Sequence, residues 1–104
     1  MEFRTSVDRL LNRVGHWEQS RWWARIGDGT RGDAMFALVQ RLADLGADAE
    51  RRPRRPVPRA GDLVLPDQLR VMADDLAAVA DAETLERATA DVEEFRHALD
   101  RKSP

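Results

Sequence analysis

The chain of 104 residues contains no cysteine, which excludes disulfide scaffolds, thiolate zinc sites and cysteine nucleophiles. It also lacks long apolar runs: no apolar segment follows Met1-Glu2-Phe3-Arg4, so we expect no signal peptide, and no stretch approaches the roughly 20 residues of a membrane span. Only two histidines are present, His16 and His97, so general acid–base catalysis has few candidates. We therefore expect a cytoplasmic protein with no membrane partner.

Lysine is almost absent, with one lysine against 16 arginines, which we read as the codon usage of a high-GC bacterial genome. Charge is unevenly distributed along the chain. Residues 1–59 hold 12 arginines against 8 acidic residues, a formal +4, and residues 60–104 hold 5 basic against 11 acidic residues, a formal −6. This asymmetry indicates either an acidic partner for the first half or mutual attraction of the halves, within one chain or between two. We favour the second interpretation.

Hydrophobic residues make up 42% of the chain, enough for one small core. A domain of this size is marginally stable alone, and oligomerisation is a common remedy. The sequence predicts a single all-α domain over 1–104, resembling a four-helix bundle. The helices are expected at about 5–25, 33–46, 67–80 and 82–101, with an extended Arg/Pro connector over 49–65.

Apolar residues recur at helical spacing in each of the four segments. The residues are Val7, Leu10, Leu11 and Val14 in the first; Met35, Leu38, Val39, Leu42 and Leu45 in the second, extended by Phe36; Leu69, Met72, Leu76 and Val79 in the third; and Leu85, Ala88, Val92, Phe95 and Leu99 in the fourth. The last two sets have heptad spacing and a short link, which predicts a C-terminal antiparallel helical hairpin.

Helix ends are indicated by capping residues. Thr5 or Ser6 is expected to cap the first helix, Asp33 the second and Asp81 the fourth, and Pro66 suits the first turn of the third. Three prolines within 53–58 forbid a helix in the connector. It should be extended and stiff. Residues 63–65 are read as an extended approach to the third helix, and the sequence leaves open an intermolecular strand there.

The first helix contains a conflict, because its tryptophans do not share one face with its apolar stripe. Either Gly15 ends the first piece, or the helix is continuous and Glu18 pairs with Arg21 at an interface. On a straight helix Trp23 cannot share the core with Leu11, so it is exposed or buried against a second chain. Large exposed aromatic side chains mark contact sites. We therefore expect a partner contact at Trp17, Trp22 and Trp23, the alternative being that Trp23 packs under the connector.

Two motifs match chemistry only superficially. Gly27-x-Gly29-x-x-Gly32 has the spacing of a dinucleotide loop but follows no strand of a βαβ unit, so we read it as a turn between helices. Glu94-x-x-His97 has the spacing of di-iron bundles, but those need a second such motif. The pair is expected to face solvent, and no metal or cofactor is predicted.

Arg9 and His16 have an Arg-x6-His spacing that resembles the signature of HEPN-type ribonucleases, small helical bundles that dimerise. In that family the arginine and histidine of two chains converge on a scissile phosphate. The resemblance covers eight residues and implies that these two side chains cleave RNA. It departs from the family where Leu10 replaces the usual polar residue after the arginine.

The connector carries five arginines suited to phosphate contacts, and these are also the candidates for an acidic protein partner: Arg51, Arg52, Arg54, Arg55 and Arg59. No helix-turn-helix, zinc finger or aromatic sheet accompanies them. We favour a structural connector or protein-docking strap over nucleic-acid binding.

The sequence as a whole predicts a non-enzymatic helical protein-interaction module that forms a homodimer. A nucleic-acid-associated protein that uses the Arg/Pro strap is the first alternative, and a small dimeric HEPN-like ribonuclease is the second.

Overall fold

The structure, a computed structural model, describes residues 2–101 and confirms the all-α class. The elements are α1 (Phe3–Val14), α2 (Gln19–Trp22), β1 (Arg25–Ile26), β2 (Gly29–Thr30), α3 (Arg31–Ala49), the 3-10 turn η1 (Asp62–Val64), α4 (Leu65–Val79) and α5 (Ala82–Ala98). The two short strands pair as an antiparallel hairpin, with Arg25 opposite Thr30 and Ile26 opposite Gly29.

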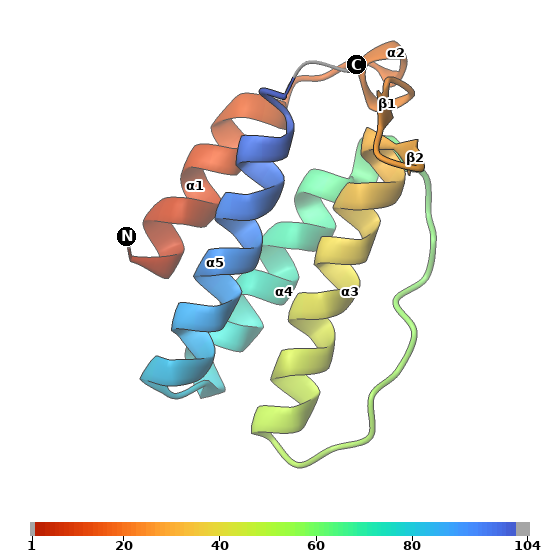
Figure 1. The fold of residues 1–104 in the computed structure, drawn as a ribbon. Helices are drawn as coiled ribbons and strands as arrows, with labels where there is room; N and C mark the ends of the chain where they lie inside the picture. Colours follow the sequence, from red (N-terminus) through yellow and green to blue (C-terminus); the bar gives the residue numbers. More distant parts are fainter. Residues whose placement is uncertain (1, 102–104) are drawn as a thin grey trace.

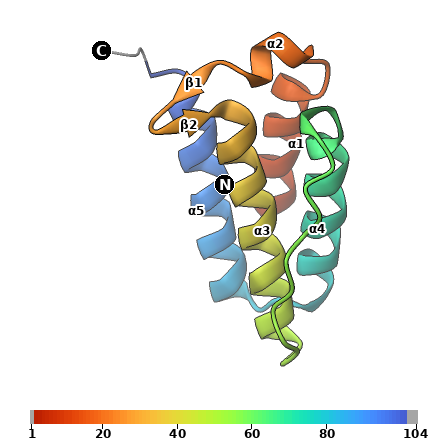
Figure 2. The same cartoon turned by 90° about the vertical axis from the view of Figure 1, so that its right-hand side faces the viewer.

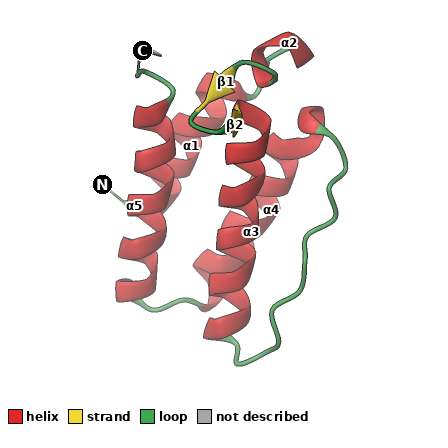
Figure 3. Cartoon of the chain, turned by 45° about the vertical axis from the view of Figure 1, so that its right-hand side comes forward, coloured by secondary structure: helices red, strands yellow, loops and turns green. Residues whose placement is uncertain are grey.

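Four long helices lie around one core (Figure 1). α1 packs against α5 and α4, and α3 packs against the same two helices. α3 and α4 run in the same direction, because the connector returns along the length of the molecule before α4 begins (Figures 1 and 3). α1 and α5 run in the opposite direction to them.

The two C-terminal helices are consecutive and antiparallel, joined through Ala80 and Asp81. Their main neighbours, however, come from earlier in the chain: α3 for α4, and α1 for α5. Their apolar faces therefore meet in the common core and do not form a self-contained hairpin seam.

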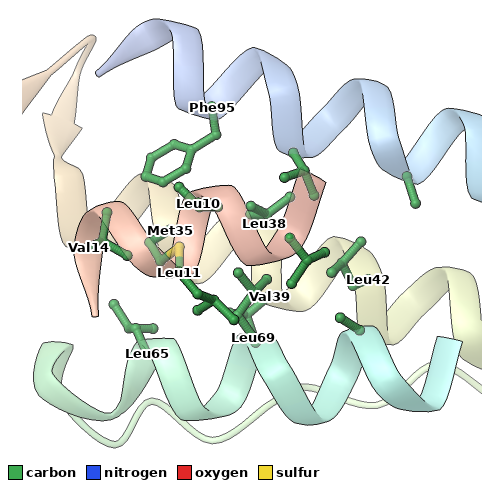
Figure 4. Close-up of a cluster of buried hydrophobic side chains, with 14 of the residues drawn as sticks. Leu10, Leu11, Val14, Met35, Leu38, Val39, Leu42, Leu65, Leu69 and Phe95 are labelled. Atoms are coloured by element: carbon green, nitrogen blue, oxygen red, sulfur yellow. The ribbon is translucent and has the colours of Figure 1, made fainter. Parts of the chain in front are cut away.

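The core is built from one face of each long helix (Figure 4). The predicted stripes of α1 and α3 are buried, as are Ala88, Val92, Phe95 and Leu99 of α5, with Leu85 partly buried. On α4 the prediction is displaced. The buried residues are Leu65, Leu69, Ala73 and Leu76, while Met72 is only partly buried and Val79 is 41% exposed.

Two expected caps are wrong, because other side chains reach the free amides first. Glu2 caps α1, and its carboxylate accepts hydrogen bonds from the backbone N–H groups of Arg4 and Thr5. α3 begins two residues before the expected Asp33, with Thr30 as its cap. Thr30 and Asp33 form a capping box, since each side chain accepts from the other's backbone N–H at 3.0 Å. Asp81 caps α5 as predicted.

The structure decides between the two interpretations of the first helix. α1 ends at Val14 with Gly15 as its cap, and the chain turns before the single turn of α2. Trp17 and Trp22 then enter the core with their ring centroids 4.8 Å apart. A continuous helix to residue 25 is therefore wrong, because it would point these rings away from the core.

The connector is extended over residues 52–61, as three prolines require. Its predicted last residues are different: 62–64 form η1, and Leu65 already belongs to α4, with Pro66 in its first turn. The turn buries Leu65 and leaves Leu63 in solvent. Within residues 2–101, no helix is both long and apolar enough to cross a membrane.

Candidate interaction surfaces

Large apolar side chains are exposed mainly on two consecutive elements, η1 and α4. Across residues 2–101 these are Trp23 (64% exposed), Leu63 (61%), Val71 (54%), Val79 (41%) and Val64 (37%). Four of the five lie on η1 and α4. α4 therefore presents apolar side chains both to the core and to solvent, which is unusual for a helix at the surface of a small domain.

The solvent-facing residues of α4 follow their own heptad. Val64, the last residue of η1 and the N-cap of α4, is spaced seven residues from Val71, which is spaced seven from the exposed Ala78; we call these three residues the outer stripe. Seven-residue spacing keeps side chains on one side of a helix. The exposed carboxylates of Asp67 and Asp75 flank the stripe.

The three tryptophans differ in how far they are exposed to solvent. Trp17 and Trp22 are 6% and 1% exposed, so both belong to the core and offer little surface to a partner. The guanidinium groups of Arg21 and Arg31 lie 5.2 and 5.0 Å from the centroid of the Trp17 ring. Trp23 remains in solvent and does not pack under the connector, so it is the tryptophan left for contact with a partner. Trp23 is the C-cap of α2, and α2 contacts η1, which places Trp23 at the same end of the molecule as Leu63.

Three arginines of the connector are engaged by carboxylates. Arg52 pairs with Glu50 at 2.7 Å, and Arg59 with Asp33 at 3.1 Å and with Asp62. Arg59 also lies over the ring of Phe36, 4.7 Å from its centroid.

The third of these arginines, Arg54, binds Asp48 of α3 through two nitrogens, at 2.7 and 3.0 Å. This contact lowers the pKa of Asp48 and raises that of Arg54. Arg51 and Arg55 form no ion pair within the described part of the chain.

The connector is also held by its backbone. The Gln40 amide donates to the carbonyl of Arg55 at 3.0 Å and accepts from the N–H of Val57 at 2.7 Å. The Gln40 side chain therefore pairs with the connector backbone through one donor and one acceptor, as the backbone of a neighbouring β-strand would. Val57 is buried against the core, and the Gln68 amide donates to the Pro58 carbonyl at 3.0 Å. The connector runs lengthwise beside α3 and α4, from the end of α3 back to the start of α4 (Figure 2).

Below the Val57 anchor, the connector encloses a groove of about 570 Å³ between the C-terminal halves of α3 and α4. Small residues of α3 leave the space, namely Ala43, Gly46 and Ala47, and the apolar floor includes Leu42 and Leu76. The sequence interpretation missed this groove. Its signal was the run of small residues near the end of a helix that is otherwise lined with leucine and valine.

Ion pairs within the chain join its basic first half, residues 1–59, to its acidic second half, residues 60–104. Five ion pairs join residues 1–59 to residues 60–104: Arg4–Asp74, Arg13–Asp100, Arg41–Asp91, Arg59–Asp62 and Arg70–Asp8. Their side chains are mostly exposed, so each contributes at most about 1 kcal/mol. They support the interpretation that the two halves attract each other.

Glu93 is one of two adjacent glutamates on α5, but its carboxylate is largely shielded from solvent. Its side chain is 19% exposed and accepts hydrogen bonds from the Ser6 hydroxyl of α1 at 2.6 Å and from Arg96 at 2.7 and 3.3 Å. These donors, Arg96 first, lower the pKa of Glu93 to about 2. Ser6 is fully buried, so this polar cluster ties α1 to α5. The signal in the sequence was the serine inside an apolar stripe.

The motifs that match known functional sites only in spacing lie in a turn or at the surface of the molecule. Gly27 lies at the tip of the β1–β2 hairpin with a φ of 56°, a conformation that favours glycine. Glu94 and His97 face solvent, and no group of three or more potential metal ligands occurs in residues 2–101. Arg9 and His16 are both exposed, and His16 lies beyond the end of α1.

Comparison of the chain with protein-family models, with curated proteins and with solved structures finds no match in any of the three.

Proposed function

We propose that this protein is a non-enzymatic helical protein-interaction module that forms a homodimer through the outer stripe of α4. The observation that carries the proposal is the concentration of exposed large apolar side chains on η1 and α4. Removing such side chains from water drives protein association. The cytoplasmic location and bacterial origin expected from the sequence belong to the same proposal.

A second copy of the chain fits this stripe because the stripe is symmetric about its centre. Val64 lies seven residues before Val71, and Ala78 lies seven residues after it. When two α4 helices pair in antiparallel fashion across a two-fold axis at Val71, each Val64 meets the partner's Ala78. Such an isologous contact closes on itself and needs no third component.

The dimer should be weak and should respond to salt in a characteristic way. α4 has 15 residues, about 22 Å at about 1.5 Å per residue, so the interface is small. In the antiparallel pairing, Asp67 opposes the partner's Asp75. Like charges repel, and salt screens that repulsion. Association should therefore strengthen as sodium chloride increases.

The experiment is sedimentation velocity at protein concentrations from micromolar to millimolar, in low and high salt. Val71→Asp should abolish the dimer, because it places a charge at the two-fold axis. Ala90→Asp, at an exposed position of α5, is the matched control and should leave the dimer unchanged. Equal behaviour of the two variants, or a monomer at every concentration, would refute the proposal.

The two alternatives rest on fewer observations. Nucleic-acid binding through the strap has fewer available cations than the sequence suggests, because carboxylates engage Arg52, Arg54 and Arg59. It predicts an affinity that falls steeply with salt and drops when the five arginines become serine. The ribonuclease alternative predicts RNA cleavage that disappears when Arg9 and His16 are replaced.

A further inference from the structure

The groove beneath the connector has the size and lining of a ligand site. Its volume of about 570 Å³ lies within the range of roughly 300–1,000 Å³ typical of small-molecule pockets. The floor consists of Leu42 on α3 with Met72 and Leu76 on α4, and Val57 closes it from above. Leu42 and Leu76 are already excluded from water, so an aliphatic ligand laid on this floor would bury its own surface and the exposed parts of Met72 and Val79.

One wall of the groove offers a single uncompensated cation. Arg55 lines the groove, and its backbone carbonyl is fixed by the Gln40 amide at 3.0 Å. Its guanidinium group has no carboxylate partner in residues 2–101. Arg52, also on the rim, is neutralised by Glu50 at 2.7 Å. A guanidinium group in this position matches the two oxygens of a carboxylate.

The opposite wall sets the direction of the ligand. Asp75 of α4 lines the groove and likewise has no ion-pair partner among the described residues. An anionic group is repelled from that wall and attracted to the connector. The two walls together favour a head at the connector and an apolar chain towards α4.

We propose that this groove binds a monoanionic amphiphile, an aliphatic chain with one carboxylate, whose head contacts Arg55 and whose chain lies over Leu42, Met72 and Leu76. The proposal does not depend on the α4 dimer. Val71, the centre of the outer stripe, does not line the groove, although Asp75 and Ala78 near one end of the stripe do. A substitution at Val71 therefore tests the dimer without altering the lining of the groove.

The test is a titration of the full chain with decanoate below its micelle concentration, followed by ¹H–¹⁵N NMR with the Gly46 amide as reporter. Arg55→Gln removes the cation, and Arg51→Gln is its control, because Arg51 is exposed, unpaired and outside the groove. The loss of one charge-assisted contact should weaken decanoate binding about tenfold in Arg55→Gln and leave Arg51→Gln unchanged.

A second variant tests the groove itself. Gly46→Leu is expected to fill part of the groove, because Gly46 lines the groove and no atom lies within 4 Å of the position of a Cβ there. It should abolish decanoate binding while the protein stays folded, and Ala37→Leu on the exposed face of α3 should bind as the parent does.

Decanol and decyltrimethylammonium complete the test of the head group. The proposal expects weaker binding of both than of decanoate. Stronger binding of the ammonium compound would assign the site to Asp75 and overturn the proposal, as would decanoate binding that both Arg55→Gln and Gly46→Leu leave intact. Since Val71→Asp should bind decanoate normally, a failure of the dimer proposal is distinguishable from a failure of this one.

Discussion

α4 and α5 are consecutive helices of similar length, yet they use their surfaces differently. α5 buries one apolar stripe and turns charged or small residues outward. α4 buries Leu65, Leu69, Ala73 and Leu76, and it exposes a second apolar stripe on the other side. Water solvates the charged face of α5 well, whereas burying the apolar outer face of α4 against a partner would be favourable.

The two helices also differ in how they are attached. α5 is joined to α1 partly by polar contacts, in which the buried Ser6 hydroxyl and Arg96 meet Glu93. α4 is joined to α3 by apolar packing and by a strap that leaves a groove. The polar contacts between α1 and α5 fix the position of these two helices relative to each other. The small residues of α3 leave the groove between α3 and α4, on the other side of the molecule.

The largest effect should separate the two stripes of α4. Leu69 is fully buried, and Leu69→Ala should lower the free energy of unfolding by about 2–5 kcal/mol. Val71→Ala, on the outer stripe, should change it by less than about 0.5 kcal/mol. Urea unfolding at micromolar protein concentration measures both, and a large loss from Val71→Ala would show that its side chain already packs within one chain.

The next effect concerns the polar contact of α5. Glu93 has its pKa lowered to about 2 from an ordinary 4.5, so its contribution to stability is complete above about pH 4.5 and is lost as pH falls towards 2. Glu93→Gln should cost about 1.5 kcal/mol at neutral pH, the lower end for a hydrogen bond to a charged group. Thermal unfolding as a function of pH should show this difference vanish in acid.

The control for this prediction is the neighbouring exposed carboxylate of Glu94. Glu94→Gln should leave the acid limb of the stability curve as it is in the parent. If Glu93→Gln keeps its full deficit at pH 2, the contact depends on packing and not on the charge of the carboxylate.

A smaller effect concerns the strap on the α4 side. Gln40→Ala removes both hydrogen bonds to the connector backbone and should cost about 1 kcal/mol in all. Hydrogen exchange at the Val57 amide should accelerate, because that N–H donates to Gln40. Gln68→Ala, which breaks the bond to Pro58, should leave the Val57 amide protected. Unchanged exchange in Gln40→Ala would mean that burial of Val57 alone holds the strap.

The contrast between α4 and α5 also explains where sequence reasoning succeeds. On α5 a single apolar period exists, and the predicted residues are buried in the core, except Leu85, which is partly buried against it. On α4 two apolar periods overlap, and the expected seam mixes Leu69 and Leu76 of the core with the exposed Val79. Periodicity alone does not say which of two stripes faces inward, because that depends on the neighbouring helices.

Other features could not be predicted from the sequence either, because they too depend on how the elements pack together. Proline spacing predicts the extended strap, but not its hydrogen bonds to Gln40 or the groove behind it. The turn after Gly15 was one of two readings, since a local pattern does not reveal that burying Trp17 and Trp22 outweighs the hydrogen bonds of a longer helix. Long-range partners such as Ser6 and Glu93 are set by the packing of α1 on α5.

The most direct test of the α4 dimer uses the absence of cysteine from the sequence. A Val71→Cys variant places one thiol at the proposed two-fold axis, where two copies can bring their Cα atoms within the roughly 4.4–6.8 Å that a disulfide requires. Under mild oxidation we expect a covalent dimer from Val71→Cys and monomer from Ala90→Cys on a non-reducing gel. Equal crosslinking of both variants, or none with Val71→Cys, would contradict it.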